Sequence, residues 1–264
     1  MASYILVMYG AMYVYETLVL VMLVADARPL LARPSAIPDT LWNTAFSDRL
    51  DTATSSALMK IALDHWQFER DSVNKHVPFL LQRCEAYRDH GDERSVFHLE
   101  FTLGTLYKQV NDAPKSIQHF FAALSLADKL EEVEDVALIN MEIGLIYYMQ
   151  ASWERAITFF RRSLSFYESV GDTRRSTVRR YLIALSLNNL DRYTESLPLF
   201  RSIYRQYEEA GNIPRLLETG TGLANALRGA GQADSAERVY LQLLEIARKN
   251  NDQRTAFYAT VYAG

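Results

Sequence analysis

Residues 135–174 read DVALINMEIGLIYYMQASWERAITFFRRSLSFYESVGDTR, and this stretch contains one complete structural repeat. Apolar residues recur every three or four positions in both halves, which is the spacing of one face of an α-helix. Ala151-Ser152 separates the halves, and Gly171-Asp172 ends the stretch with residues that favour the end of one helix and the start of the next. The stretch therefore predicts two helices joined by a short turn.

The same pattern recurs on both sides of this stretch at a fixed interval of 40 residues, without gaps. In the first helix of each repeat, a small residue stands among apolar ones. Along the chain it is Gly104, Gly144, Ala184 and Ala224. Because a larger side chain would push two crossing helices apart, we expect each small residue to lie at a helix–helix contact.

The second helix of each repeat carries a small residue followed four positions later by an aromatic ring. The pairs are Ser116 with Phe120, Ala156 with Phe160, Ser196 with Phe200, and Ala236 with Tyr240. Residues four apart share one face of a helix, so this face is predicted to pack in the core.

Two departures from the pattern carry structural expectations. Pro78 and Pro198 share one position inside the second helix, where proline is expected to kink the helix or delay its start. Gly220, Gly222 and Gly229 all fall in one first helix. Each glycine costs roughly 1 kcal/mol against alanine in a helix, so we expect that hairpin to be the least rigid.

These residues resemble the tetratricopeptide repeat, whose signature combines Leu-Gly, Tyr, Ala and an aromatic residue. Leu103-Gly104-x-x-Tyr107 carries the resemblance, and the period of 40 is similar to a longer-helix subclass found in bacterial signalling and regulatory proteins. The resemblance implies an all-α fold, a right-handed superhelical solenoid of antiparallel helical hairpins. It also implies a scaffold that binds proteins or peptides and is not an enzyme.

The repeat divides the chain into three regions. Residues 1–27 are predicted to be a hydrophobic signal peptide or membrane anchor, residues 28–54 a connector rich in Pro, Ser, Thr and Asp, and residues 55–264 the array. The predicted blocks are 55–94, which is degenerate, then 95–134, 135–174, 175–214, 215–254 and an incomplete 255–264. Because the last block stops inside its first helix, we expect the chain to be part of a longer protein or a truncated product.

The apolar run from Tyr4 to Val24 is long enough to cross a bilayer as a helix, and Glu16 is its one charge. The run ends at Ala25-Asp26-Ala27, a pattern of small residues of the kind that signal peptidases recognise. It is either a secretory signal or an uncleaved anchor. A buried capping helix fits less well, because the run has no polar face. We therefore expect export or membrane association, in the periplasm or cell envelope, over a cytoplasmic location.

The composition excludes several classes of protein. The chain has 264 residues, is 49% hydrophobic and 23% charged, and carries a net charge of −4. This composition is globular, and an acidic chain has no overall field that attracts nucleic acid, so we expect no direct nucleic-acid binding. The single cysteine, Cys84, excludes a disulfide within the chain and is predicted to be a small core residue.

No motif for chemistry is present in the sequence. The five histidines form neither an H-E-x-x-H pair nor a Cys/His cluster, and there is no glycine-rich phosphate loop or G-x-S-x-G turn. We therefore predict no catalytic residue, no cofactor and no metal.

The resemblance also implies a groove lined by the first helices, where an extended peptide would bind. Its wall changes along the chain from aromatic and Met-rich to amide and basic, which suits a peptide with an apolar part and a carboxylate part. The predicted groove residues are Phe101, Lys108, Met141, Tyr148, Tyr181, Asn188, Asn225 and Arg228.

Two functions compete on this basis. The first is a scaffold that binds a protein or peptide in the groove. The alternative is the ligand- or peptide-sensing region of a larger bacterial signal-transduction protein, whose output domain lies beyond Gly264.

Overall fold

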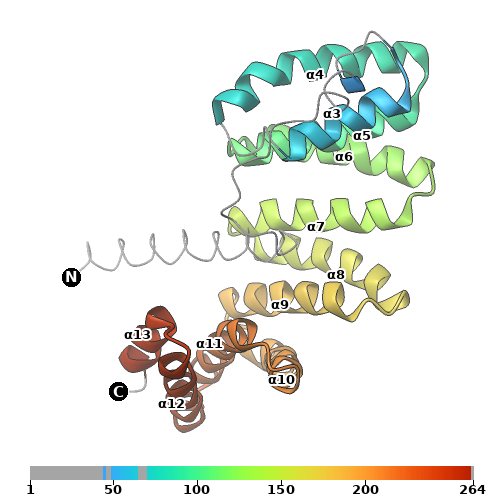
Figure 1. The fold of residues 1–264 in the computed structure, drawn as a ribbon. Helices are drawn as coiled ribbons and strands as arrows, with labels where there is room; N and C mark the ends of the chain where they lie inside the picture. Colours follow the sequence, from blue (N-terminus) through green and yellow to red (C-terminus); the bar gives the residue numbers. More distant parts are fainter. Residues whose placement is uncertain (1–43, 46–48, 65–69, 263–264) are drawn as a thin grey trace. The chain divides into compact units, whose positions relative to one another are not determined.

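The computed structural model describes residues 44–45, 49–64 and 70–262 (Figure 1). Helices account for the regular structure of this described part, and no strand occurs in it, so the all-α prediction is confirmed. The helices are α3 (Thr52–Asp64), α4 (Arg70–His90), α5 (Glu93–Gln109), α6 (Ala113–Lys129), α7 (Val133–Met149), α8 (Trp153–Ser169), α9 (Thr173–Asn189), α10 (Tyr193–Glu209), α11 (Ile213–Gly229), α12 (Ala233–Lys249) and α13 (Gln253–Tyr262).

The 40-residue period corresponds to two helices of equal length. Each helix from α5 to α12 spans 17 residues. These helices begin at residues 93, 113, 133, 153, 173, 193, 213 and 233, a constant interval of 20. Each helix is therefore followed by a turn of three residues, and neighbouring helices run antiparallel.

The turns share one backbone conformation. A residue with positive φ occurs every 20 residues from Gly91 to Asn251. The next amide donates to the carbonyl five residues back, as from Asp172 N to Tyr167 O at 2.9 Å, and the positive-φ amide donates three residues back. This pair of bonds is the Schellman motif that ends helices. Besides four glycines, the motif accommodates Asn111, Glu131, Ala151, Asp191 and Asn251.

Ala151 should be replaceable by glycine with a gain in stability. Its φ is 56°, a conformation in which the Cβ of an L-residue costs roughly 1–2 kcal/mol and glycine has no such cost. We expect Ala151→Gly to raise the free energy of unfolding by about 0.5–1 kcal/mol, measured by urea unfolding and circular dichroism. The reverse change at the equivalent position of the next turn, Gly171→Ala, should lower the free energy of unfolding by a similar amount. A loss of stability in both variants would contradict the left-handed turn.

The described residues form two compact units, which divide between Leu126 and Ala127. In the first unit, α3 and α4 both pack against α5. Between α5 and α6, Ser116 Oγ donates to the Gly104 carbonyl oxygen at 2.6 Å. A Cβ atom on Gly104 would lie 2.8 Å from the Phe120 ring. The small residue that the sequence predicts at this helix contact is confirmed.

In the second unit, each helix from α7 to α13 packs against the next. A Cβ atom on Gly144 would lie 2.6 Å from the Phe160 ring, which repeats the contact between Gly104 and Phe120. The small and aromatic residues of the second helices are all at most 2% exposed: Ser116, Phe120, Ala156, Phe160, Ser196, Phe200, Ala236 and Tyr240. The predicted core face is confirmed in both units.

The glycines of α11 have a packing role that the sequence did not indicate. A Cβ atom would lie 2.5 Å from the Phe200 ring at Gly222 and 2.9 Å from the Tyr204 ring at Gly220. At Gly229 it would lie 2.2 Å from the Tyr193 ring. The three rings come from α10, and they contact α11 in antiparallel order. The glycines therefore allow a close approach of two helices, rather than marking a loose hairpin.

The expectation that proline delays the second helix is wrong. α4 and α10 both contain their prolines, Pro78 and Pro198, in the interior. α10 begins at the same repeat position as α8 and α12. The physical reason is that the packing of the whole helix outweighs the one backbone hydrogen bond that the proline removes.

The predicted signal peptide or anchor, 1–27, lies outside the described residues, as does most of the predicted connector, 28–54. Helix α3 begins at Thr52, inside that connector. Among the described residues, no helix has the length and apolar character needed to span a membrane.

Candidate functional site

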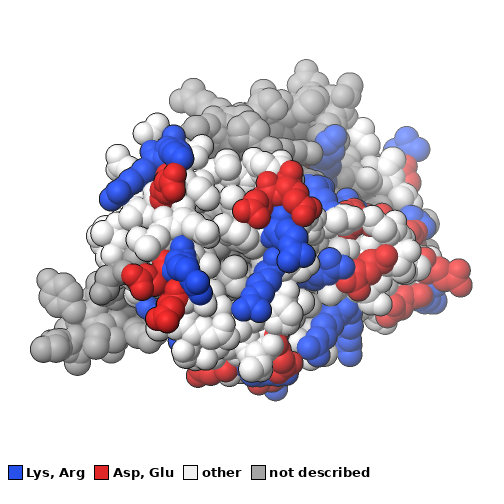
Figure 2. All heavy atoms as spheres, turned by 90° about the horizontal axis from the view of Figure 1, so that it is seen from below, with Lys and Arg blue, Asp and Glu red and all other residues white. Residues whose placement is uncertain are grey.

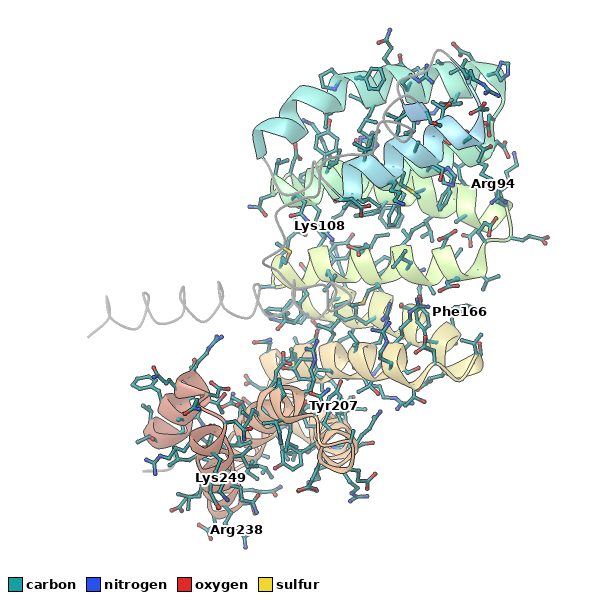
Figure 3. The ribbon with its side chains drawn as sticks, viewed as in Figure 1. Arg94, Lys108, Phe166, Tyr207, Arg238 and Lys249 are labelled. Carbon is teal, nitrogen blue, oxygen red and sulfur yellow. The ribbon has the colours of Figure 1, made fainter. Side chains whose placement is uncertain are left out.

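The predicted groove residues fall in both units. Phe101 and Lys108 lie on α5 in the first unit, and both are half-buried. Figure 3 labels Lys108. The Phe101 ring meets the Phe120 ring edge-on at 5.7 Å, so part of it belongs to the core. The other six predicted residues lie in the second unit.

Three of these six are core residues, which corrects the prediction. Met141, Tyr148 and Tyr181 are only 1%, 3% and 6% exposed. The Tyr148 ring packs edge-on against Trp153 at 4.8 Å, and the Tyr181 ring against Phe200 at 6.0 Å. Both tyrosine rings thus contact the second helix of their own hairpin. They hold the helices together and have little surface to offer a ligand.

The remaining three lie on adjacent first helices of the second unit. Asn188 on α9 donates its Nδ2 to the Gly222 carbonyl of α11 at 3.2 Å, and its Oδ1 accepts from Ser196 Oγ. Asn225 and Arg228 are three residues apart on α11, which places them on one face of that helix. Asn225 and Arg228 thus share a helix face, and the hydrogen bond from Asn188 to Gly222 places Asn188 against the same helix.

Asn225 is oriented by a buried tyrosine. The Tyr240 hydroxyl of α12 donates to Asn225 Oδ1 at 2.7 Å. Burial raises the pKa of Tyr240 to about 12, so the hydroxyl keeps its proton at neutral pH. With its oxygen engaged, Asn225 presents its Nδ2 group as a donor.

Arg228 has an aromatic platform. Its guanidinium lies 4.4 Å from the centroid of the Tyr262 ring of α13. In the described part of the chain, no carboxylate forms an ion pair with Arg228, and its side chain is exposed. An exposed arginine stacked on a ring is held in place while its donors stay available. Asn225, Arg228 and Tyr262 are here called the amide–arginine site.

The amide–arginine site has the chemistry to bind a carboxylate. A planar guanidinium with a neighbouring amide donor matches the geometry of a carboxylate. Tyr262 was not singled out by its sequence, because only the packing of α13 on α11 brings its ring to Arg228.

A buried charged cluster in the first unit was also missed. Glu100 on α5 is 2% exposed and forms an ion pair with Arg88. Its other oxygen lies 2.7 Å from His119 Nδ1, whose ring stacks on Tyr107. Cys84 Sγ donates to Glu100 at 3.5 Å. Since these partners come from α4, α5 and α6, the cluster ties three helices together.

The cluster also explains Cys84, which the sequence predicted as a core residue. Cys84 is 1% exposed. Burial, with the negative charge of Glu100, raises the pKa of its thiol to about 12. A thiol that keeps its proton is a poor nucleophile and metal ligand. Within the described residues, no group of His, Cys, Asp and Glu side chains has the arrangement of a metal site.

Charges elsewhere are mixed. Figure 2 shows acidic and basic side chains interspersed on the face that it draws, with uncharged areas between them. Several of the pairs are formed within one helix, such as Lys249 with Glu245 at 2.6 Å. Such a surface is typical of solvated helix faces.

From α5 to α12 the helices have equal length and follow one another at a constant interval, an arrangement found in α-helical repeat proteins. Residues 221–254 match the model of the tetratricopeptide repeat family, a match to one segment of the array. This segment covers α12 and the half of α11 that carries Asn225 and Arg228, whereas Tyr262 on α13 lies beyond it. No curated protein sequence matches the chain.

Solved structures share the fold. One is a signal transduction ATPase with a tetratricopeptide repeat sensor from Pyrococcus horikoshii, with a TM-score of 0.72 and 13% identity over 84% of this chain and 34% of that one. Another is a protein with TPR-like repeats described as a kinesin light chain, from Podosopora anserina, with a TM-score of 0.63 and 14% identity over 75% and 96%. A third is aspartyl phosphate phosphatase F from Bacillus subtilis, with a TM-score of 0.63 and 16% identity over 80% and 57%. At these identities the likeness shows the fold alone.

Proposed function

We propose that the chain is a non-catalytic scaffold that binds a protein or peptide partner through a carboxylate. The observation that carries this proposal is Arg228, an exposed guanidinium that is held over Tyr262 and has no carboxylate partner among the described residues. An arginine fixed in this way loses less freedom when it binds a planar anion. A C-terminal carboxylate or an acidic side chain of a peptide has the required shape and charge.

Asn225 supports the same assignment, whereas Asn188 does not take part in it. Asn225 supplies a second donor beside Arg228, with its oxygen occupied by Tyr240. Asn188 has a structural role, because both ends of its amide are bonded within the protein, to Gly222 and Ser196. We therefore assign the contact with the peptide carboxylate to Arg228 and Asn225. Phe101 and Lys108 stay predicted groove residues of the first unit.

A pull-down with matched arginine variants tests this function. Arg228 and Arg248 are both exposed and lie in the last turns of α11 and α12. We expect the full chain to capture a partner from a lysate of its source organism, Arg228→Ala to lose it, and Arg248→Ala to keep it. A peptide of that partner should then bind at least about tenfold more weakly when its carboxylates are amidated. Equal capture by both variants would remove the amide–arginine site from the function.

The second candidate is a sensing region within a larger signal-transduction protein. The similarity to the repeat sensor of the Pyrococcus ATPase favours it, since this chain spans 34% of that protein. Under this proposal, peptide binding at the amide–arginine site would be transmitted to an output domain. The complete reading frame decides between the candidates: a stop codon directly after Gly264 would contradict the second.

We also propose that the array acts in the cell envelope. The apolar run Tyr4–Val24 supports this location by its length and by the small residues that follow it. Cell fractionation followed by sequencing of the N-terminus tests it. A soluble cytoplasmic chain that retains Met1 would contradict both export and anchoring.

A further inference from the structure

Exposed arginines recur at one position of the second helices in the second unit. Arg161 on α8 and Arg201 on α10 occupy the same repeat position, 40 residues apart, and both are exposed. Arg162 lies beside Arg161, and Arg205 follows Arg201 by one helical turn, and these two are exposed as well. We call these four residues the arginine row. They lie on second helices, whereas the amide–arginine site lies on first helices and α13.

Few acidic side chains on the same helices are placed to neutralise the charge of the arginine row. Arg161, Arg162 and Arg201 have no acidic residue three or four positions away on their own helices, and that spacing is the one at which helical ion pairs form. Other basic residues of this unit have such partners. Arg192, for example, binds both oxygens of Glu195, at 2.7 and 2.8 Å.

The carboxylates that face the row are engaged elsewhere or lie at its ends. Glu195 is close enough to act on Arg161, but its two oxygens are bonded to Arg192. Glu168 pairs with Arg180 of α9 at 2.7 Å. Glu208 and Glu209 lie in the last turn of α10, beyond Arg205. The centre of the row is therefore positively charged.

An apolar side chain continues the row on α12. Leu241 occupies the repeat position of Arg161 and Arg201, and it is 49% exposed. Arg238 lies one turn earlier on α12 and extends away from the helix (Figure 3). The face made by α8, α10 and α12 thus presents cations with one exposed leucine at the end.

We propose that this face is a second docking surface, and that its partner is an acidic protein segment with an apolar side chain beside its carboxylates. Charge complementarity selects the acidic segment, since arginine forms paired hydrogen bonds with carboxylates. Leu241 selects a partner that also buries apolar surface, because an exposed leucine gains by leaving water. Leu241 favours a protein segment over nucleic acid, because a phosphate backbone offers no aliphatic side chain against which the leucine could pack.

Fluorescence anisotropy with a labelled synthetic peptide of Glu, Asp and Leu tests the proposal on the full chain. We expect Arg161→Glu/Arg201→Glu to weaken binding about tenfold or more, and Leu241→Ala about threefold. The matched control is Arg174→Glu/Arg248→Glu, which makes the same change in net charge at exposed positions outside the row and should alter binding less than about twofold. Circular dichroism checks that each variant is folded.

Three outcomes would overturn the proposal. The first is no binding of the acidic peptide, or equal weakening by the row and control variants. The second is tighter binding of a thymidine oligonucleotide than of the peptide, which would make the row a general polyanion surface. The third is loss of the acidic peptide in Arg228→Ala, which would place it in the amide–arginine site. The proposed function is tested separately, by partner capture with Arg228→Ala. A negative result for the arginine row therefore does not contradict the amide–arginine site, and the reverse also holds.

Discussion

Replacing Phe160 with alanine should lower the free energy of unfolding by about 3–5 kcal/mol. The ring is 0% exposed and faces Gly144, which leaves no side chain that could close the space. Truncation would remove the burial of the ring and leave a cavity between α7 and α8. Urea unfolding followed by circular dichroism measures the loss. In a helical repeat the effect should be largest in the hairpin that contains the cavity.

The neighbouring ring provides the control for this experiment. Phe159 is partly exposed and stacks on Tyr147 at 5.5 Å. Phe159→Ala should therefore cost much less than Phe160→Ala, about 1–1.5 kcal/mol for a partly exposed aromatic pair. An unchanged melting curve for Phe160→Ala, or a larger loss for Phe159→Ala, would show that the core face is assigned to the wrong helical register.

Replacing Gly222 with alanine should destabilise the protein by about 1–3 kcal/mol, although alanine is the better helix former. A Cβ atom there would lie 2.5 Å from the Phe200 ring. Phe200 is 0% exposed, so its ring has no free volume to move into. The gain of roughly 1 kcal/mol in helix propensity is therefore smaller than the cost of overpacking. Chemical unfolding of the single variant gives the sign directly.

A double-mutant cycle separates overpacking from other causes. Phe200→Leu shortens the side chain that meets position 222, so Gly222→Ala should cost less in the Phe200→Leu background than in the natural protein. The expected interaction energy is at least about 0.5 kcal/mol. Additive effects of the two changes would mean that the Gly222–Phe200 contact does not limit the space, and a stabilising Gly222→Ala would rule out the close approach of α10 and α11.

The hairpins could be predicted from the sequence because their determinants are local. The small-and-aromatic pairs recur at helical spacing, and Gly171-Asp172 recurs in related form at 91–92 and 211–212. Helix starts, Schellman turns and the buried face of the second helices all follow from residues within about one turn of each other. Each repeat also supplies independent support for the register of the others.

The candidate site was predicted only in part, because its residues lie on helices whose environment is not local. Helix α7 is apolar on nearly all faces, so periodicity does not separate its core side from a binding side. Met141 and Tyr148 were consequently assigned to the groove and are buried. Asn225 and Arg228 lie on one face of α11 because they are three residues apart, and their part in a groove stays a prediction.

The glycines of α11 also could not be interpreted from their local sequence. Helix propensity alone makes Gly220 and Gly222 unfavourable. Their purpose becomes visible only with the rings of Tyr204 and Phe200 against them. A glycine in a helix has two opposite meanings, flexibility or close packing, and the residues that decide between them lie on another helix.

Sequence by itself determined the helical class, the 40-residue period, the turn positions and the core rings of the second helices, because these depend on contacts between residues close along the chain. Only the tertiary structure decided which first-helix residues keep an exposed surface. It also brings Arg88, His119 and Cys84 into contact with Glu100. The Tyr262 ring stacks on Arg228 for the same reason. Burial and charge pairing depend on neighbours from other helices. A side chain's local sequence specifies the face of its own helix on which it lies, and the packing of the next helix specifies whether that face is covered.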